Sequence, residues 1–202
     1  AWLSLLAICL LGAMSPGPSL AVVMRAAIGG GRSSGVAAAL AHGAGVGLYG
    51  LLTVTGLAVV LAQSPTAYLA VQLLGAFYLI WLGMKSLRSH GSSTNATTPA
   101  TGSNRGAALE GFLVAFLNPK LAVFMLALFS QFLQPGYGTT EKIIMATTVA
   151  CADGLWYSLV ASLVSRPTFL ARLRNSQALI DRVFGVILVA LAISVLVNAL
   201  LL

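Results

Sequence analysis

The hydrophobic positions of this chain form long, nearly uninterrupted blocks, and short polar segments separate the blocks. Several blocks reach about 18 residues or more, the length that a helix needs to cross a bilayer. The pattern therefore predicts an all-α polytopic membrane protein with six transmembrane helices. The expected spans are residues 2–24, 35–62, 67–84, 109–133, 143–165 and 183–202.

The first apolar block also has the length of a signal-peptide core. No basic residue precedes it, however, and apolar character resumes after Pro18. We therefore interpret residues 2–24 as one span with an interruption.

The composition excludes an ordinary soluble domain. Of the 202 residues, 58% are hydrophobic and only 7% are charged, whereas soluble domains carry about 25% charged residues. The net charge of +7 would suggest nucleic-acid binding in a soluble protein. Here the basic residues lie between the spans, so the expected partner is the lipid bilayer and not nucleic acid.

The basic residues between the spans are distributed unevenly. Segments 25–34, 85–108 and 166–182 hold nine of them, whereas the other two connecting segments hold one. Connecting loops that are rich in Lys and Arg stay in the cytoplasm. We therefore expect these three loops to be cytoplasmic and both termini to face outside.

A polar segment divides the chain into two similar halves. Residues 89–108 are rich in Ser, Thr, Gly and Asn, which is typical of a flexible linker. Residues 1–88 and 109–202 each contain three predicted spans and together form one membrane domain. Each half opens with a proline-interrupted span and closes with a glycine-started apolar helix. Because three spans is an odd number, we expect two inverted three-helix repeats, an arrangement typical of transporters.

Two interruptions within predicted spans carry the most specific chemistry. They are Ser15-Pro16-Gly17-Pro18 in the first span and Asn118-Pro119-Lys120 in the fourth. An interior proline costs a helix about 3 kcal/mol, and in lipid the freed backbone groups must face a cavity or other protein. Ser15 and Asn118 are favoured N-caps placed directly before a proline, so each break predicts a new helix start. The alternative is a pair of proline kinks that serve only helix packing.

A helix start inside the membrane favours anion binding. Its N–H groups and about half a positive charge attract groups such as a carboxylate. Gly17 lets a ligand approach the backbone closely, and Lys120 adds a full positive charge next to the second break. A lysine within a span can also extend to the lipid headgroups, which is the alternative interpretation of Lys120.

Two further ionisable residues lie within predicted spans, where such residues are functional candidates. His42 and Asp153 occupy equivalent positions of the two halves, and a glycine follows each. They are candidates to bind a substrate amino group, to carry protons, or to pair with each other. Histidine titrates near neutral pH, which suits proton coupling. A purely structural hydrogen bond between them is the alternative.

The motifs of cofactor, metal and catalytic sites are absent from the sequence, so we expect no cofactor, no metal and no enzyme activity. Cys9 and Cys151 lie far apart and lack a CxxC spacing. A single buried carboxylate is a poor cage for a hard cation, and export of an inorganic cation is kept as an alternative function. A non-transport membrane protein, such as a thiol–disulfide electron carrier or a scaffold, is the other alternative.

Several short motifs follow one another in a specific order along the chain. They are Ser15-Pro16-Gly17-Pro18, Gly31-Arg32-Ser33-Ser34-Gly35, Gly56-Leu57-Ala58, Gly75-Ala76-Phe77-Tyr78-Leu79-Ile80-Trp81-Leu82-Gly83, and Asn118-Pro119-Lys120 followed by Phe124 and Gln131-Phe132. In these motifs the chain resembles the LysE/RhtB family of amino-acid exporters over nearly its full length. The resemblance implies a multi-pass protein of the bacterial inner membrane that exports amino acids or close derivatives, driven by protons. A homo-oligomer is compatible with this picture.

The combined hypothesis assigns each end of a small-molecule substrate to a set of residues. The carboxylate would bind at the helix starts formed by Ser15, Pro16, Gly17, Pro18, Asn118, Pro119 and Lys120. The amino group would bind near Asp153 and the carbonyl groups before the breaks. His42 and Asp153 are the candidates for proton coupling, and one half would rock against the other to give alternating access.

Overall fold

The computed structural model describes residues 2–15, 17–88 and 103–200, and all regular structure within these ranges is helical. The seven helices are α1 (Trp2–Met14), α2 (Pro18–Gln63), α3 (Pro65–Leu87), α4 (Asn104–Phe116), α5 (Pro119–Phe132), α6 (Thr139–Leu163) and α7 (Pro167–Leu200). The expectation of an all-α fold is thus confirmed for the described residues.

Four of these helices are long and apolar enough to cross a membrane, namely α2, α3, α6 and α7. Helices α4 and α5 qualify together as a fifth candidate span, bent by 54° at the break between them. Helix α1 is apolar, but its 13 residues are too few to cross a bilayer alone. The structure therefore contains four or five candidate spans, and the count of six stays a prediction.

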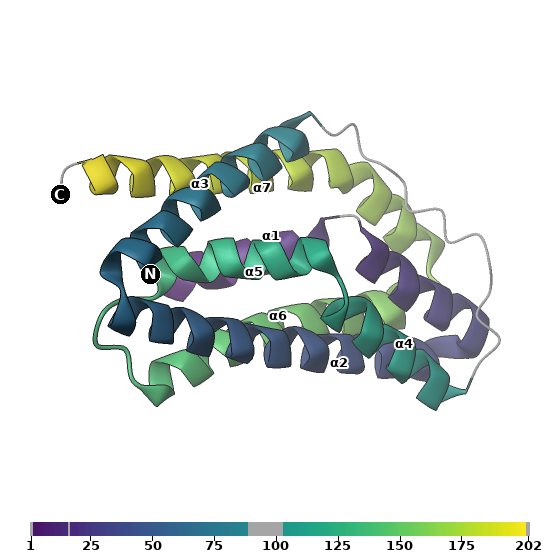
Figure 1. The fold of residues 1–202 in the computed structure, drawn as a ribbon. Helices are drawn as coiled ribbons and strands as arrows, with labels where there is room; N and C mark the ends of the chain where they lie inside the picture. The colour runs from purple at the N-terminus through teal and green to yellow at the C-terminus, as the bar shows by residue number, and fades with distance from the viewer. Residues whose placement is uncertain (1, 16, 89–102, 201–202) are drawn as a thin grey trace.

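The prediction of a loop at residues 25–34 is wrong, because helix α2 continues through this segment. Gly31 alone departs from helical geometry there, with φ 80° and ψ 175°. Positive φ is readily available to glycine, so one residue turns the chain back without a loop. In Figure 1, α2 runs outward to the right and then returns along the lower edge of the molecule.

Two other expected loops are also shorter than predicted. Helix α7 begins at Pro167, so most of segment 166–182 is helical rather than a loop. Helix α4 begins at Asn104, with the Ser103 side chain accepting from the Gly106 N–H at 3.3 Å, so the end of segment 89–108 is helical as well. Residues 89–102 of the predicted linker lie outside the described residues. In both segments polar residues occupy the first turns of a helix, and their polarity alone does not distinguish a helix end from a loop.

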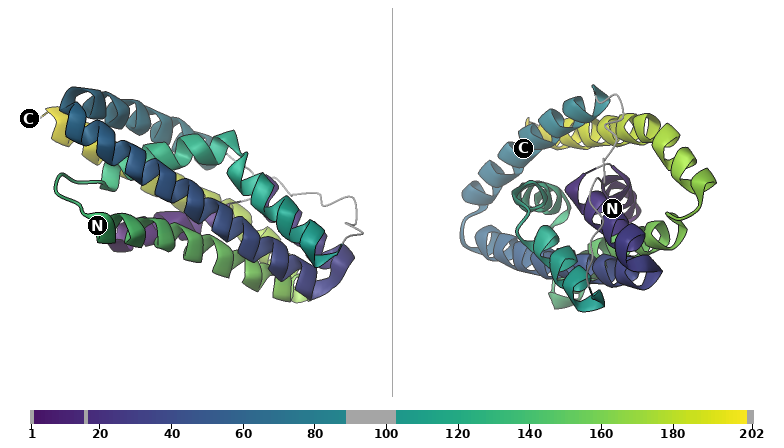
Figure 2. Two further views of the ribbon diagram at one scale, coloured as in Figure 1. Left: turned by 60° about the horizontal axis from the view of Figure 1, so that its bottom comes forward. Right: turned by 90° about the vertical axis from the view of Figure 1, so that its right-hand side faces the viewer.

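The helices form two layers with two short helices between them. Helix α2 packs along α6 and α4 in one layer, and α3 packs along α7 in the other. Helices α1 and α5 lie between the layers (Figures 1 and 2). The buried core joins these parts, with the side chains of Ile8, Leu79 and Phe129 among its most deeply buried members.

A close approach of backbones fixes the crossing of α2 and α6. A Cβ atom at Gly43 would lie 2.9 Å from the carbonyl oxygen of Ala150 and 2.9 Å from the Cα of Gly154. Only glycine fits there, as at other tight contacts between membrane helices. The crossing brings together the residues that directly precede the two glycines, His42 and Asp153.

Candidate functional site

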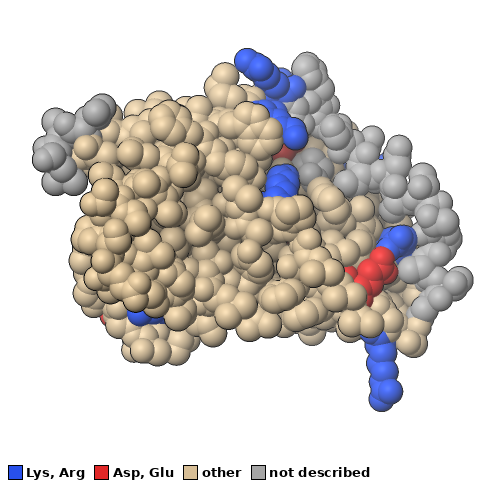
Figure 3. Space-filling view, in the orientation of Figure 1, with Lys and Arg blue, Asp and Glu red and all other residues tan. Residues whose placement is uncertain are grey.

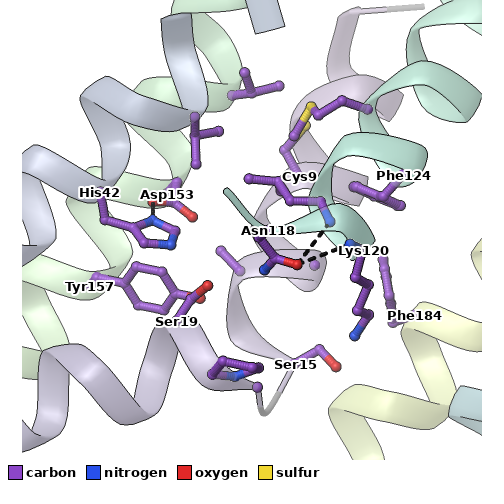
Figure 4. A pocket seen from close by; sticks show the side chains of 18 of the residues that line it. Cys9, Ser15, Ser19, His42, Asn118, Lys120, Phe124, Asp153, Tyr157 and Phe184 are labelled. Atoms are coloured by element: carbon purple, nitrogen blue, oxygen red, sulfur yellow. Dashed lines mark hydrogen bonds and ion pairs between the residues drawn. The ribbon is translucent and has the colours of Figure 1, made fainter. Parts of the chain in front are cut away.

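The two helix breaks line a single cavity inside the molecule. The first break separates α1 from α2, and the second separates α4 from α5. The cavity has a volume of about 100 Å³ and is lined by parts of α1, α2, α3, α5, α6 and α7 (Figure 4). Segments about a hundred residues apart in the sequence therefore meet at one place.

At the second break, the helix start predicted from sequence is confirmed. Asn118 is the N-cap of α5, and its Oδ1 accepts from the backbone N–H groups of Lys120 at 3.0 Å and Leu121 at 3.3 Å. Pro119 occupies the first helical position, where its missing N–H costs nothing. The first amide groups of α5 are thus partly occupied by the protein's own side chain.

At the first break, the predicted N-cap role of Ser15 is wrong. The backbone N–H of Ser15 donates to the Leu11 carbonyl at 3.0 Å, so Ser15 completes the last turn of α1. Helix α2 begins at Pro18 with Gly17 as its N-cap, in extended conformation. The physical reason is that a residue before proline is kept out of helical geometry, so Pro18 moves the helix start past Gly17. Pro16 lies outside the described residues.

The start of α2 is open toward the cavity. Gly17 has no side chain to cap the helix, and no side-chain hydrogen bond caps it in the described part of the chain. Gly17, Pro18 and Ser19 all line the cavity. A helix start carries partial positive charge and N–H groups that lack helical partners. The first break therefore presents the partial positive charge of a helix start to the cavity, although Ser15 does not form it.

A buried pair of side chains joins α2 to α6. His42 Nδ1 lies 2.6 Å from Asp153 Oδ2, and the two residues are 1% and 8% exposed. The ring of Tyr157 stands edge-on to the His42 ring, with 5.2 Å between the ring centres. The pairing that the sequence left as one of three alternatives is present, at the wall of the cavity.

Lys120 gives the cavity its positive side chain. It extends from the first turn of α5 toward Phe184 of α7, while His42 and Asp153 lie on the other side of the cavity (Figure 4). Lys120 remains accessible to solvent. The cavity thus has a cationic end and, across from it, a carboxylate–imidazole end.

Most of the predicted site residues come together here. Those that line the cavity are Ser15, Gly17, Pro18, His42, Asn118, Lys120 and Asp153. Pro119 instead lines a neighbouring pocket against α4.

Asp181 is a residue of this region that the sequence pattern does not predict. The pattern places it in the loop before a span that begins at residue 183, yet it lies within α7 and is only 2% exposed. Its Oδ1 accepts from Ser15 Oγ at 2.9 Å, and its carbonyl oxygen accepts from Ser86 Oγ at 2.7 Å. The sequence does contain a hint of this burial. Asp181 follows the apolar residues Leu179 and Ile180, and Phe184 lies one helical turn later, so an apolar helix face surrounds the carboxylate.

Tyr157 lines the cavity as well, and so do Cys9, Ser19 and Phe184, which were not predicted as site residues. Cys9 is buried at the cavity, whereas Cys151 is exposed on α6, and neither is in a disulfide. Within residues 2–15, 17–88 and 103–200, no group of three or more His, Cys, Asp or Glu residues is placed to hold a metal ion.

Comparison with known proteins identifies the family of this chain. The family model described as LysE type translocator matches residues 10–199. The homoserine/homoserine lactone efflux protein of Salmonella typhimurium is 28% identical over 91% of this chain and 90% of its own length. The threonine efflux protein of Escherichia coli K12 is 23% identical over 92% of each chain. A membrane protein of Haemophilus influenzae is 30% identical over 92% of this chain and 90% of its own. No solved structure matches the chain significantly.

Proposed function

Since the chain belongs to the LysE type translocator family, which comprises transporters and not enzymes, we propose that it exports amino acids or close derivatives from the bacterial cytoplasm across the inner membrane. The observation that carries this proposal is the single cavity shared by both helix breaks and the His42–Asp153 pair. Relatives named as homoserine and threonine efflux proteins support the substrate class.

The size of the cavity supports a small substrate. Its volume of about 100 Å³ is well below the roughly 300–1,000 Å³ of pockets for drug-sized ligands. Its two charged ends suit a zwitterion: the carboxylate binds between the start of α2 and Lys120, and the amino group binds near Asp153. Opposite charges at opposite ends thus orient a small amino acid across the cavity.

The proposal includes six spans in two inverted repeats, at residues 1–88 and 109–202. The first span would consist of α1 and the part of α2 before Gly31, matching α4 and α5 in the second half. Gly31 and Gly136 support this match, because these two glycines have positive φ in the described chain and each follows a broken span. A second support is the crossing of α3 and α7, the last helices of the two halves, where the two glycines Gly83 and Gly185 face each other. A Cβ at Gly83 would lie 2.8 Å from the Gly185 carbonyl oxygen, and a Cβ at Gly185 would lie 2.6 Å from the Gly83 carbonyl oxygen.

The distribution of charge supports the proposed orientation in the membrane. In Figure 3, charged side chains gather on the right-hand half of the visible face, and the left-hand half is nearly uncharged apart from its lower edge. The right-hand end is where α3 ends and α4 begins. We assign this end to the cytoplasm by the positive-inside rule, which places both termini outside.

A substrate screen in bacteria tests the proposed function. Cells that overexpress the protein should release at least one amino acid several-fold faster than control cells, measured by mass spectrometry of the medium. Asp153→Asn should abolish this release at normal membrane abundance, because the amide carries no charge for the amino group. The matched control is Glu141→Gln, which likewise replaces a carboxylate by an amide on α6 but at an exposed position outside the cavity. Equal release from Asp153→Asn cells and unmodified cells would remove Asp153 from the site.

The helix breaks are tested in the same assay. The double variant Pro18→Ala/Pro119→Ala removes the proline at the first position of α2 and of α5, which loosens both helix starts, so release should fall. Pro135→Ala is the control, since Pro135 lies in the connection between α5 and α6. If the double variant releases amino acids as fast as the control, the breaks serve only packing. If no amino acid is released by any version of the protein, the export function itself is wrong.

A further inference from the structure

His42 and Asp153 line the cavity side by side, and only one of the two His42 ring nitrogens has a partner. Nδ1 contacts Asp153 Oδ2 at 2.6 Å, whereas Nε2 is buried without a hydrogen-bond partner in the described chain. Figure 4 shows this second nitrogen on the side of the ring that faces the cavity. An unpartnered polar atom in a buried place costs free energy, which points to a group that binds Nε2 during the transport cycle.

Asp153 determines what Nε2 can bind. A carboxylate next to Nδ1 accepts the Nδ1–H, so the neutral imidazole carries its free lone pair on Nε2. In this state the pair has a net charge of −1 and offers an acceptor to the cavity. When Nε2 takes up a proton, the pair becomes neutral and Nε2 becomes a donor. A proton and a substrate ammonium group therefore need the same lone pair.

We propose that His42 Nε2 is one acceptor that either a proton or the substrate's ammonium group occupies, never both. This inference rests on the proposed export function and adds the coupling step to it. A proton that arrives from outside binds Nε2 and displaces the ammonium group outward. After the site turns to the cytoplasm, the proton leaves Nε2 and the next ammonium group donates to it. One proton enters for each zwitterion that leaves, so each cycle moves one positive charge inward.

The other titratable groups around the cavity agree with this assignment. Asp153 and Tyr157 face His42 from α6, Cys9 lines the cavity from α1, and Lys120 lines it from α5. Lys120 is the cation among them and extends away from His42 (Figure 4). Its charge repels a substrate ammonium group, which leaves the end of the cavity formed by His42 and Asp153 as the site for that group.

The acceptor also defines the substrate class. A solute needs a protonated amino group to donate to Nε2 and an anionic group for the α2 start and Lys120. Small zwitterionic amino acids satisfy both requirements. An N-acetylated amino acid lacks the ammonium group, so N-acetylthreonine should not be carried.

Exchange in proteoliposomes tests the competition without any mutation. Purified protein would be reconstituted, and labelled threonine and homoserine would exchange against the same amino acid at equal pH on both sides. Between pH 8 and pH 5, the KM should rise about tenfold per pH unit once the site is protonated, at unchanged maximal rate, because the two ligands compete. A KM that is constant or falls in acid, with exchange intact, would overturn the proposal. Absence of exchange for both amino acids contradicts the proposed function instead.

Variants separate the role of Nε2 from a structural role. His42→Gln should slow exchange, and the KM of the remaining exchange should no longer change with pH, since an amide does not titrate in this range. An acidic outer solution should drive threonine export through the unmodified protein but not through this variant. Ser158→Ala is the control. Like His42 Nε2, the Ser158 Oγ atom is buried and has no hydrogen-bond partner in the described chain, but it lies on α6 outside the cavity. Proton-driven export that persists in His42→Gln would overturn the proposal, and if the variant does not reconstitute, the pH series of the unmodified protein decides.

Discussion

The two helix breaks look alike in sequence but differ in what holds them. At the second break, Asn118 caps α5 with two hydrogen bonds from its own side chain. At the first break, Gly17 leaves the start of α2 uncapped, and Ser15 turns to Asp181 of α7. The second break is thus completed locally, whereas the first is tied to a helix that lies far away in the sequence.

This difference suggests different roles in anion binding for the two breaks. A capped helix start has already used part of its capacity to bind an anion, because the cap oxygen occupies its first N–H groups. The uncapped start of α2 keeps that capacity for a ligand. We therefore expect the substrate carboxylate to depend more on the first break than on the second, with Lys120 supplying charge from across the cavity.

Giving the first break a cap should produce the largest effect. Asp at position 17 is a favoured N-cap, fits the extended backbone of Gly17 and places a negative charge at the anion site. Gly17→Asp should lower threonine or homoserine export by at least about tenfold, since a loss of about 1.4 kcal/mol in binding is already tenfold. The same variant should unfold at a higher temperature in detergent, because a new cap contributes about 0.5–2 kcal/mol.

Gly17→Ala is the matched control for that variant. Nothing lies within 4 Å of the Cβ that it adds, so the change neither caps the helix nor disturbs its neighbours. Its export should stay well above that of Gly17→Asp, and its unfolding temperature should not rise. If Gly17→Asp exports normally while stabilising the protein, the start of α2 does not bind the substrate.

Removing the tether of the first break should have the next largest effect. Ser15→Ala leaves Asp181 Oδ1 without the donor at 2.9 Å in a place that is only 2% exposed. The loss of a partner for a buried polar group costs about 1–3 kcal/mol, so the unfolding temperature should fall and export should drop severalfold. Ser86→Ala removes only the hydrogen bond to the Asp181 backbone carbonyl. Equal losses of export in both variants would show that the Ser15 contact has no special role.

The sequence predicted the second break better than the first for a physical reason. Asn118-Pro119 contains its cap and its first helical residue side by side, so local preferences suffice. In Ser15-Pro16-Gly17-Pro18 two prolines compete for the helix start, and the second one excludes helical geometry at Gly17. The partner of Ser15 lies 166 residues away, and no local pattern identifies such a contact.

The same distinction between local and distant information applies to the rest of the molecule. The apolar blocks and the equivalent places of His42 and Asp153 follow from local patterns, and the structure brings these two residues within 2.6 Å. Polar residues flank Gly31 and predict a loop there, although helix continues on both sides of the turn. Polar residues around Asp181 likewise predict a loop, and only the packing of α7 against α1 and α3 shows that Asp181 is buried.

Removing the cap of the second break should have the smallest effect on export. Two variants of Asn118 separate the contribution of the cap from that of charge. Asn118→Ala loses both side-chain hydrogen bonds to the first turn of α5, which should lower the free energy of unfolding by about 1 kcal/mol, within the usual range for caps. Export per folded molecule should fall only moderately, since the carboxylate depends mainly on α2 and Lys120. Asn118→Asp keeps the cap, so its thermal stability should match that of the unmodified protein, but its charge faces the same cavity as Lys120 and should reduce export further. Should Asn118→Asp export at the unmodified rate, the second break lies too far from the bound carboxylate to sense charge, and the first break with Lys120 is the whole anion site.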